Sequence, residues 1–262
     1  MNRARLPQAD VARLRDFGLR VLSRRGVLAA DEEQAARASL GEMQAQAGGT
    51  ELLAEGARLN RAQILLEGWA VHQRVLSDGR RQIFSFLLPG DIFGISARLN
   101  GEALCSAFAL TSVVTAPLAM LDEALRRAPG SGCGRIVREA LGLEESFLVN
   151  QVVRLGQQSA QERLINLLLE FYDRLAAVGL VEDDSFVLPF TQEVLSDAVG
   201  LSTVHTNRTL QQLRREHLIE THLNQTRLID RKRLAEMADY RMVPCLETAA
   251  APRDHANADM PL

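Results

Sequence analysis

Residues 191–219 read TQEVLSDAVGLSTVHTNRTLQQLRREHLI, which contains two short helical patterns separated by the turn Val199-Gly200-Leu201-Ser202. Thr191 is a typical N-cap residue, and Gly200 stands where a helix commonly ends in the left-handed conformation. The first helix is therefore about two turns long. Ser202 is a typical N-cap for the second helix. The stretch predicts two helices joined by a tight turn.

The second helix divides into an inward and an outward row of side chains. The inward positions are Thr206, Thr209, Leu210 and Leu213, and the outward positions are Thr203, Val204, Asn207, Arg208, Gln211 and Gln212. Between Asp197 and Glu216 the chain has no carboxylate. A face without acidic groups does not repel phosphates, as a helix that enters a DNA groove requires. The pattern favours a recognition helix over its alternative, two surface helices of any globular protein.

The residues after this helix predict a β-hairpin. Residues 218–223 and 226–229 read as two short strands around the polar turn Asn224-Gln225. A hairpin directly after a recognition helix is a wing. Asp230 is then a suitable N-cap for a last helix through Arg231, Leu234, Met237 and Tyr240.

The residues before the two helices extend the same unit. Ser159 and Glu162 have the spacing of a capping box, and an amphipathic run follows that stops at Gly179. Residues 186–190 fit a short strand leading into Thr191. In this order of helix, strand, two short helices and hairpin, residues 159–240 resemble the winged helix-turn-helix of the Crp/Fnr superfamily of bacterial transcription regulators.

The front of the chain has a different pattern, with short apolar runs between regularly spaced glycines. The turn dipeptides Asp78-Gly79, Pro89-Gly90 and Asn100-Gly101 separate runs such as Ile83 to Leu88. This spacing predicts many short strands in a sandwich or barrel, or in another β-rich domain. The segments DGRRQ (78–82) and PGDIFG (89–94) also resemble the jelly-roll sensor of Crp/Fnr proteins, so that the resemblance covers about residues 50–240.

Between these regions, apolar side chains at Val137, Leu141, Leu148, Val152 and Leu155 lie near one helical stripe. Glu144 and Gln151 interrupt the stripe, and a strict heptad is therefore not supported. An ordinary core helix fits the pattern nearly as well. The family resemblance implies the long helix that pairs two subunits, since a palindromic operator needs a two-fold symmetric protein.

The fold class expected from these patterns is α+β, with five segments. Residues 1–49 form an N-terminal helical segment, 50–130 a jelly-roll sensor domain, 131–158 a dimerisation helix, 159–240 a winged helix-turn-helix domain and 241–262 a disordered tail. The composition, 262 residues with 47% hydrophobic, allows two modest cores. We expect each of the two larger domains to bury its own.

The partners that follow are double-stranded DNA carrying a palindromic operator, a second copy of the chain, an unknown effector and, if the protein activates transcription, RNA polymerase. The residues expected at the DNA are Thr191, Ser202, Thr203, Val204, Asn207, Arg208, Gln211, Arg214, Arg215 and Arg227. Arg208 can grip guanine through O6 and N7, whereas Val204 offers methyl groups to a thymine methyl.

The bulk properties set limits on these expectations. A net charge of -3 and a pI near 6.0 mean that DNA affinity must come from a local patch. No apolar run is long enough to span a membrane, and the N-terminus does not read as a secretory leader. The three cysteines, Cys105, Cys133 and Cys245, form no spaced cluster, which indicates a reduced cytoplasmic protein.

The effector is the least determined feature. In cyclic-nucleotide-binding relatives an acid holds the ribose and an Arg-Ser pair grips the phosphate, whereas here those places fall on Ile95 and on Cys105-Ser106. A phosphodiester without its guanidinium loses a bidentate contact, so that the departure argues against cyclic AMP. An iron-sulfur cluster needs four thiolates, whereas the chain has three scattered cysteines, so that an iron-sulfur sensor is not supported.

Two alternatives remain. His72 and Cys105 are residue types that ligate haem iron, so that a haem- or redox-responsive regulator stays open. A metal-dependent cupin enzyme fused to a DNA-binding domain shares the jelly roll, but it needs clustered histidines, and His72 is the only one before His205. The sequence therefore predicts a regulator without catalytic residues, metal site or assigned cofactor, and not an enzyme.

Overall fold

Two four-stranded antiparallel sheets face each other in the front half of the chain. The computed structural model describes residues 6–126 and 130–243 of the 262. The sheet orders are β1-β8-β3-β6 and β2-β7-β4-β5. The strands are β1 (Gln44–Gln46), β2 (Glu51–Leu53), β3 (Gln63–Glu67), β4 (Ala70–Val75), β5 (Arg81–Leu87), β6 (Ile92–Phe93), β7 (Ser106–Ala109) and β8 (Val113–Pro117). The short helices α3 (Ile95–Asn100) and α4 (Leu121–Arg126) follow β6 and β8. The predicted jelly roll is confirmed.

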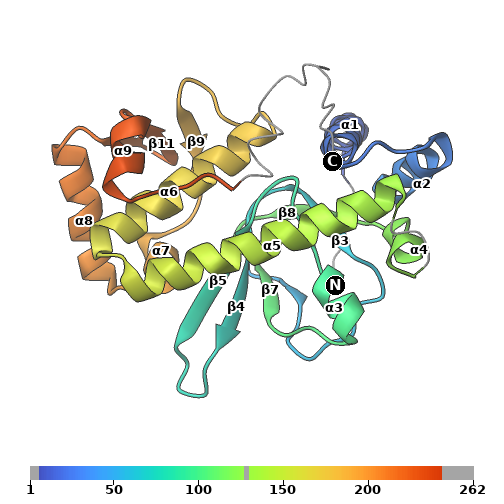
Figure 1. The fold of residues 1–262 in the computed structure, drawn as a ribbon, viewed down its shortest axis with the longest axis horizontal. Helices are drawn as coiled ribbons and strands as arrows, with labels where there is room; N and C mark the ends of the chain where they lie inside the picture. The colour runs from blue at the N-terminus through green and yellow to red at the C-terminus, as the bar shows by residue number, and fades with distance from the viewer. Residues whose placement is uncertain (1–5, 127–129, 244–262) are drawn as a thin grey trace, which may run out of the picture.

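The turns of this sensor lie where the sequence puts glycine. Gly79 closes the projecting β4–β5 hairpin with φ +86°, a conformation that residues with a Cβ rarely adopt (Figure 1). Within the hairpin, His72 pairs with Ser85 and Gln73 with Ile83, which leaves Phe84 as a β-bulge. β1 pairs with β8, although it lies inside the segment for which the sequence suggested helices alone.

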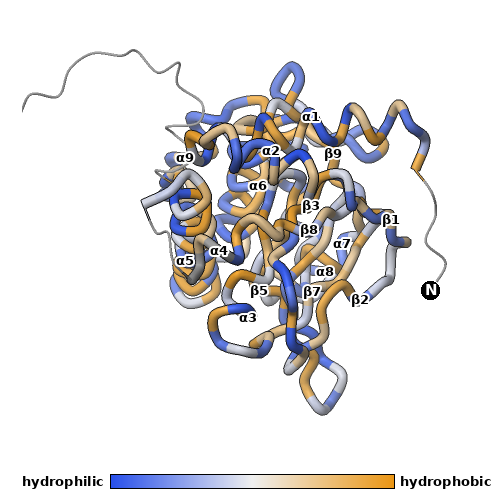
Figure 2. The backbone as a smooth tube through the Cα atoms, turned by 90° about the vertical axis from the view of Figure 1, so that its right-hand side faces the viewer, coloured by the Kyte–Doolittle hydropathy of each residue, from blue (hydrophilic) through white to orange (hydrophobic). Residues whose placement is uncertain are grey.

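Three helices flank the sheets. They are α1 (Gln8–Arg25), α2 (Ala30–Leu40) and the long α5 (Gly132–Gln157). α5 runs from α4 past the sensor to the C-terminal unit (Figure 1), and Figure 2, which looks nearly along it, shows it on one side of the strands. The face of α5 that packs against the protein includes Ile136, Ala140, Phe147 and Gln151. Gln151 is thus a buried polar residue on the packed face of α5.

The C-terminal unit is a winged helix-turn-helix, as predicted. Its elements are α6 (Ala160–Ala177), β9 (Ser185–Val187), α7 (Gln192–Val199), α8 (Thr203–Arg215), β10 (Ile219–His222), β11 (Gln225–Leu228) and α9 (Arg231–Met237). Three of the four predicted N-cap side chains form their hydrogen bonds: Ser159 accepts from the Glu162 amide, Ser202 from the His205 amide and Asp230 from the Arg233 amide.

The wing turn differs from the prediction by one residue. His222 pairs with Gln225, so that the turn is Leu223-Asn224 rather than Asn224-Gln225. Leu223 has φ +53° and is exposed at the tip. The observed register pairs Ile219 with Leu228, both of which are buried, whereas a turn at Asn224-Gln225 would pair Leu228 with the exposed Thr221.

The sensor and the C-terminal unit share their largest hydrophobic core, contrary to the expectation of one core for each. Trp69 and Phe86 of the sensor contact Phe171 on α6 and Phe190 before α7, with ring centroids 4.7 to 5.2 Å apart. Most of these pairs are edge-to-face, a favourable aromatic geometry. Sequence periodicity describes each strand and helix separately and does not indicate that their apolar faces meet.

A buried charge network joins α5 and α6 beside this core. Glu170 binds Arg154 through one carboxylate oxygen (2.6 Å) and Arg174 through the other (3.0 Å). Arg174 also contacts Asp91 of the sensor and donates to the Phe86 carbonyl at 2.6 Å. Arg154 donates to Asn166 at 2.9 Å and to Gln151. Each charge thereby has a charged or polar partner inside the protein, which such burial requires.

The tail predicted to be disordered begins with ordered residues. Val243 is buried against Leu143, Phe147 and Ala177, because it offers an apolar side chain to the groove between α5 and α6. The rest of that tail, from residue 244, lies outside the described residues. Among the helices that the structure describes, none combines the length and apolar character needed to cross a bilayer.

Candidate DNA-binding surface and sensor cavity

α8 presents one polar face to solvent and buries the other. The four residues predicted to face inward, Thr206, Thr209, Leu210 and Leu213, are all buried. Thr206 accepts a hydrogen bond from Ser196 of α7 at 3.0 Å, and the Leu201 amide donates to the Ser196 carbonyl at 3.1 Å. The angle between the two helices is therefore held by polar as well as apolar contacts.

The expected DNA-contact residues lie mainly on the exposed face of this helix. Ser202, Thr203, Val204, Arg208, Gln211 and Arg215 are exposed, whereas Asn207 and Arg214 are half-buried. Arg208 has no hydrogen-bond partner among the described residues, so that its guanidinium is available. The structure thus gathers these side chains on one surface.

Of the predicted arginines, Arg214 contacts the wing and Arg227 lies in it. Arg214 donates from Nε to the Thr221 hydroxyl of β10 at 2.7 Å, which fixes the wing relative to α8. Arg227 on β11 is exposed and lies 3.9 Å from Glu220 across the hairpin. Thr191 occupies the N-cap position of α7, but its side chain makes no capping hydrogen bond.

Two exposed residues of α8, His205 and Gln212, were not among the expected contacts. His205 is exposed in the first turn, beside Val204. With Ser202 as the N-cap, His205 lies in the first turn of α8, and the first turn of a recognition helix points into the groove.

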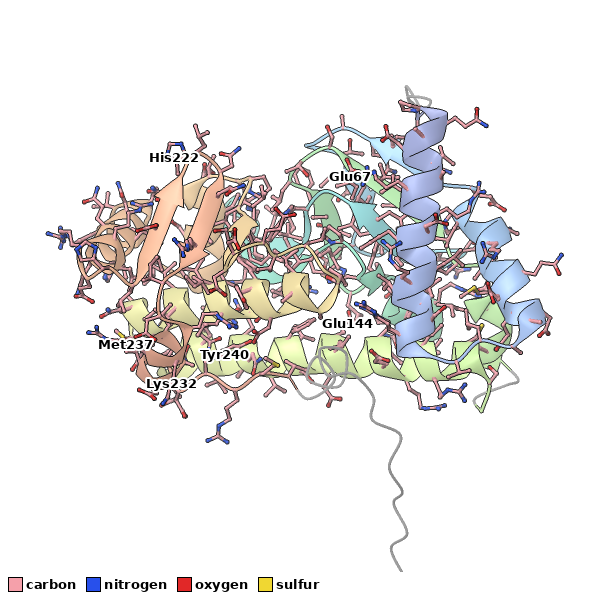
Figure 3. The ribbon with its side chains drawn as sticks, turned by 90° about the horizontal axis from the view of Figure 1, so that it is seen from above. Glu67, Glu144, His222, Lys232, Met237 and Tyr240 are labelled. Atoms are coloured by element: carbon pink, nitrogen blue, oxygen red, sulfur yellow. The ribbon has the colours of Figure 1, made fainter. Side chains whose placement is uncertain are left out.

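The wing lies far from the middle of α5, as the labels of His222 and Glu144 show in Figure 3.

A second feature is a cavity of about 680 Å³ between the sensor strands and α5. Its lining combines Phe84, Ser85 and Cys105 of the sensor with Glu144, Leu148 and other residues of α5. Most of the lining is apolar. A volume of this size is typical of small-molecule sites.

The polar groups of the cavity do not favour an anion. Among its described lining residues Arg74 is the one cation, and its guanidinium already binds Glu55 (2.9 Å) and the Leu104 carbonyl (2.5 Å). Glu144 accepts from the Ser96 hydroxyl at 3.4 Å, and burial raises the pKa of its carboxyl. An anionic ligand would need a free cationic side chain in the cavity, and the cavity offers the carboxyl group of Glu144 instead.

His72 and Cys105, 33 positions apart in the sequence, line the same cavity. Burial lowers the pKa of His72 to about 4, so that the imidazole is neutral at physiological pH. Its Nδ1 lies 3.2 Å from the Ser85 hydroxyl. Burial raises the pKa of Cys105 to about 11, which keeps the sulfur as a thiol.

Ile95 and Ser106 stand where cyclic-nucleotide-binding relatives contact the ribose and the phosphate, and neither side chain is free to do so here. Ile95 is buried in the core at the start of α3. Ser106 is also buried and donates to the Gln73 carbonyl at 3.3 Å. Neither presents a charge to the cavity.

Comparison with known proteins matches both halves of the chain. Residues 45–127 match the cyclic nucleotide-binding domain, and residues 162–237 match the Crp-like helix-turn-helix domain. The transcriptional activatory protein AadR of Rhodopseudomonas palustris is 31% identical over 190 residues, which cover 66% of this chain and 72% of AadR. The chain belongs to the Crp/Fnr family.

Other Crp/Fnr proteins agree with this assignment. The nitrogen fixation regulation protein FixK of Bradyrhizobium diazoefficiens is 30% identical over 174 residues, which cover 66% of this chain and 72% of FixK. The structure of FixK2 from Bradyrhizobium japonicum is similar with a TM-score of 0.65 at 25% identity, covering 74% of this chain and 95% of FixK2. The protein is a DNA-binding transcription regulator. Because these relatives are regulators, the cupin enzyme alternative is excluded.

Proposed function

We propose that this Crp/Fnr regulator binds a palindromic operator as a homodimer and that cyclic AMP does not control it. The observation that carries the DNA part is the exposed face of α8, which has Arg208 free and no carboxylate between Asp197 and Glu216. With Thr203, Val204 and Arg208 outward, the helix offers one guanidinium fork and small apolar groups to base edges. The free Thr191 hydroxyl at the start of α7 suits a phosphate oxygen.

The homodimer is supported by the apolar stripe on the second half of α5. Leu148, Val149, Val152 and Val153 follow helical spacing and are exposed, with Val152 at 72%. A contiguous apolar stripe of this kind is typical of a surface that another helix covers. A second copy of α5 satisfies this surface by two-fold symmetry and brings two α8 helices to one operator.

The proposal that cyclic nucleotides do not act here is supported by the charges of the cavity. Glu144 faces an apolar space in which Arg74 is already bound to Glu55. A cyclic phosphate there would meet an acid and gain no guanidinium. Calorimetry with cyclic AMP and with cyclic GMP is expected to show no binding at physiological concentrations, and micromolar affinity would contradict this part.

A haem-responsive regulator is the second candidate, since His72 and Cys105 line one cavity. The raised pKa of Cys105 counts against it, because iron is bound by the thiolate. An absorbance spectrum of the purified protein decides between them: a Soret band favours haem.

Random-site selection with the full chain tests the operator, and recovery of an inverted repeat is expected. For the dimer, Val152→Asp places a charge on the stripe, and Val27→Asp is the matched control, because Val27 is 68% exposed and lies away from it. Sedimentation is expected to give a dimer for wild type and Val27→Asp and a monomer for Val152→Asp. A wild-type monomer at the concentrations that bind DNA would refute the homodimer.

A further inference from the structure

The last turn of α7 is held by side chains from three other elements. Helix ends leave backbone carbonyls without partners inside the helix. Here the Asp197 carbonyl accepts from Gln82 of β5 at 3.2 Å, the Ala198 carbonyl from Gln151 of α5 at 2.6 Å, and the Val199 carbonyl from Arg163 of α6 at 3.0 Å. We call these three hydrogen bonds, together with the ion pair described next, the α7 clamp.

The ion pair of the clamp joins the sensor directly to the helix-turn-helix. Arg81 of β5 donates from Nε and Nη2 to one carboxylate oxygen of Asp197 at 2.9 and 2.6 Å. The two side chains are 24% and 27% exposed, so that solvent screens the pair only in part. Gln151 adds a bridge, because its amide also donates to the Ile83 carbonyl of β5 at 3.2 Å.

The clamp lies immediately before the recognition helix. α7 ends at Val199, and only Gly200, Leu201 and Ser202 separate it from α8. Gly200 has φ +65°, and the Ser196 contacts to α8 described above leave little freedom between the two helices. A displacement of the clamped turn therefore changes the direction of α8.

The same strand lines the sensor cavity. Phe84 and Ser85 lie in the cavity wall, while Arg81 and Gln82 hold α7, a separation of about 10 Å along the strand. Phe84 is also the β-bulge at which the β4–β5 register shifts. Bulges re-aim side chains and occur beside functional sites. Phe84 in the cavity wall is thus separated from Gln82 in the clamp by a single residue of β5, so that a displacement of one shifts the other.

We propose that Arg81 and Gln82 are positioning residues for DNA binding, through which strand β5 sets the direction of α8 by its grip on the end of α7. The inference rests on the proposed role of α8 at the DNA. Arg81 acts through Asp197, and neither side chain is required at the bases.

Operator affinity of the full chain tests the clamp with Arg81→Gln and Asp197→Asn. These variants remove opposite charges, but both open the same contact. If the clamp acts by position, both shift the operator dissociation constant in the same direction, by about 2-fold to 30-fold. The charge swap Arg81→Asp with Asp197→Arg is expected to return the affinity toward wild type. Arg80→Gln is the matched control, because Arg80 pairs with Asp78 on the exposed hairpin.

Opposite shifts, with tighter binding for Asp197→Asn and weaker binding for Arg81→Gln, would indicate direct attraction to phosphates and overturn the proposal. Unchanged affinity in both, or a swap that restores nothing, would also overturn it. Each titration is run at a temperature well below the unfolding midpoint of its variant. Gln82→Leu is a second probe, because it removes a clamp hydrogen bond and keeps the ion pair. It is expected to shift the operator affinity in the same direction as Arg81→Gln. Arg208→Ala in parallel separates the failures: if it too leaves affinity unchanged, α8 is not at the DNA.

Discussion

Replacing Glu170 by Gln tests the buried charge network between α5 and α6. Both carboxylate oxygens are used, one by Arg154 at 2.6 Å and the other by Arg174 at 3.0 Å. The glutamine keeps one acceptor but turns an NH2 group toward the other arginine and leaves two buried cations without their shared anion. Removing one partner of a buried ion pair costs about 3 to 5 kcal/mol.

The remaining partners place the expected loss at the lower end of that range. Arg174 keeps Asp91 and the Phe86 carbonyl, and Arg154 keeps Asn166. We expect the free energy of unfolding to fall by about 3 kcal/mol, which for a chain of this size lowers Tm by roughly 6 to 12 °C. Thermal unfolding followed by circular dichroism measures the shift.

Glu33→Gln is the matched control, since it breaks an ion pair of similar length, 2.8 Å to Arg37, on the exposed surface of α2. Exposed pairs of this kind contribute less than about 1 kcal/mol. If the two variants lose the same small amount, the network does not carry the stability that its burial implies. The reasoning from burial would then be refuted.

Three further predictions concern the DNA surface and the sensor. Arg208→Ala is expected to weaken binding to the selected operator by about 1 to 3 kcal/mol in a fluorescence titration, and an unchanged affinity would remove Arg208 from the bases. Val204→Glu adds an acceptor for the cytosine amino group, and random-site selection should therefore shift one position per half-site toward a cytosine-guanine pair; an identical half-site would show that Val204 does not face the bases. His72 has its pKa lowered by burial from 6.5 to about 4, so that the unfolded chain takes up a proton first as the pH falls. Wild-type stability should therefore drop by about 2 kcal/mol more than that of His72→Gln between pH 7 and pH 5 in urea unfolding, and parallel curves would contradict the burial of a neutral imidazole.

Features decided within a few residues could be predicted from the sequence. The caps at Ser159, Ser202 and Asp230 form because each side chain reaches an amide three residues away. The inward row of α8 follows in the same way from helical periodicity, since Thr206 and Leu213 occupy one face. These contacts need only local geometry, although Thr191 at the start of α7 makes no capping hydrogen bond in the same position.

Features that depend on distant partners could not be predicted. Gln151 is buried because carbonyls at positions 83 and 198 accept the two hydrogen bonds that its amide nitrogen donates, and no local pattern of α5 contains that information. Glu144 likewise faces a cavity whose other wall comes from the sensor. A polar residue in an apolar stripe reads the same whether it meets water or a buried partner.

The aromatic cluster at the junction of the two units has an optical consequence. Trp69 is the chain's single tryptophan, and its indole is packed against Phe171 and Phe190 of the C-terminal unit. Selective excitation of the indole therefore monitors one place in the molecule, the seam between sensor and helix-turn-helix. Its emission maximum is expected to move to longer wavelength when that seam opens to water and to stay in place when only the wing moves. The protein thus carries an intrinsic fluorophore for domain separation and needs no attached label.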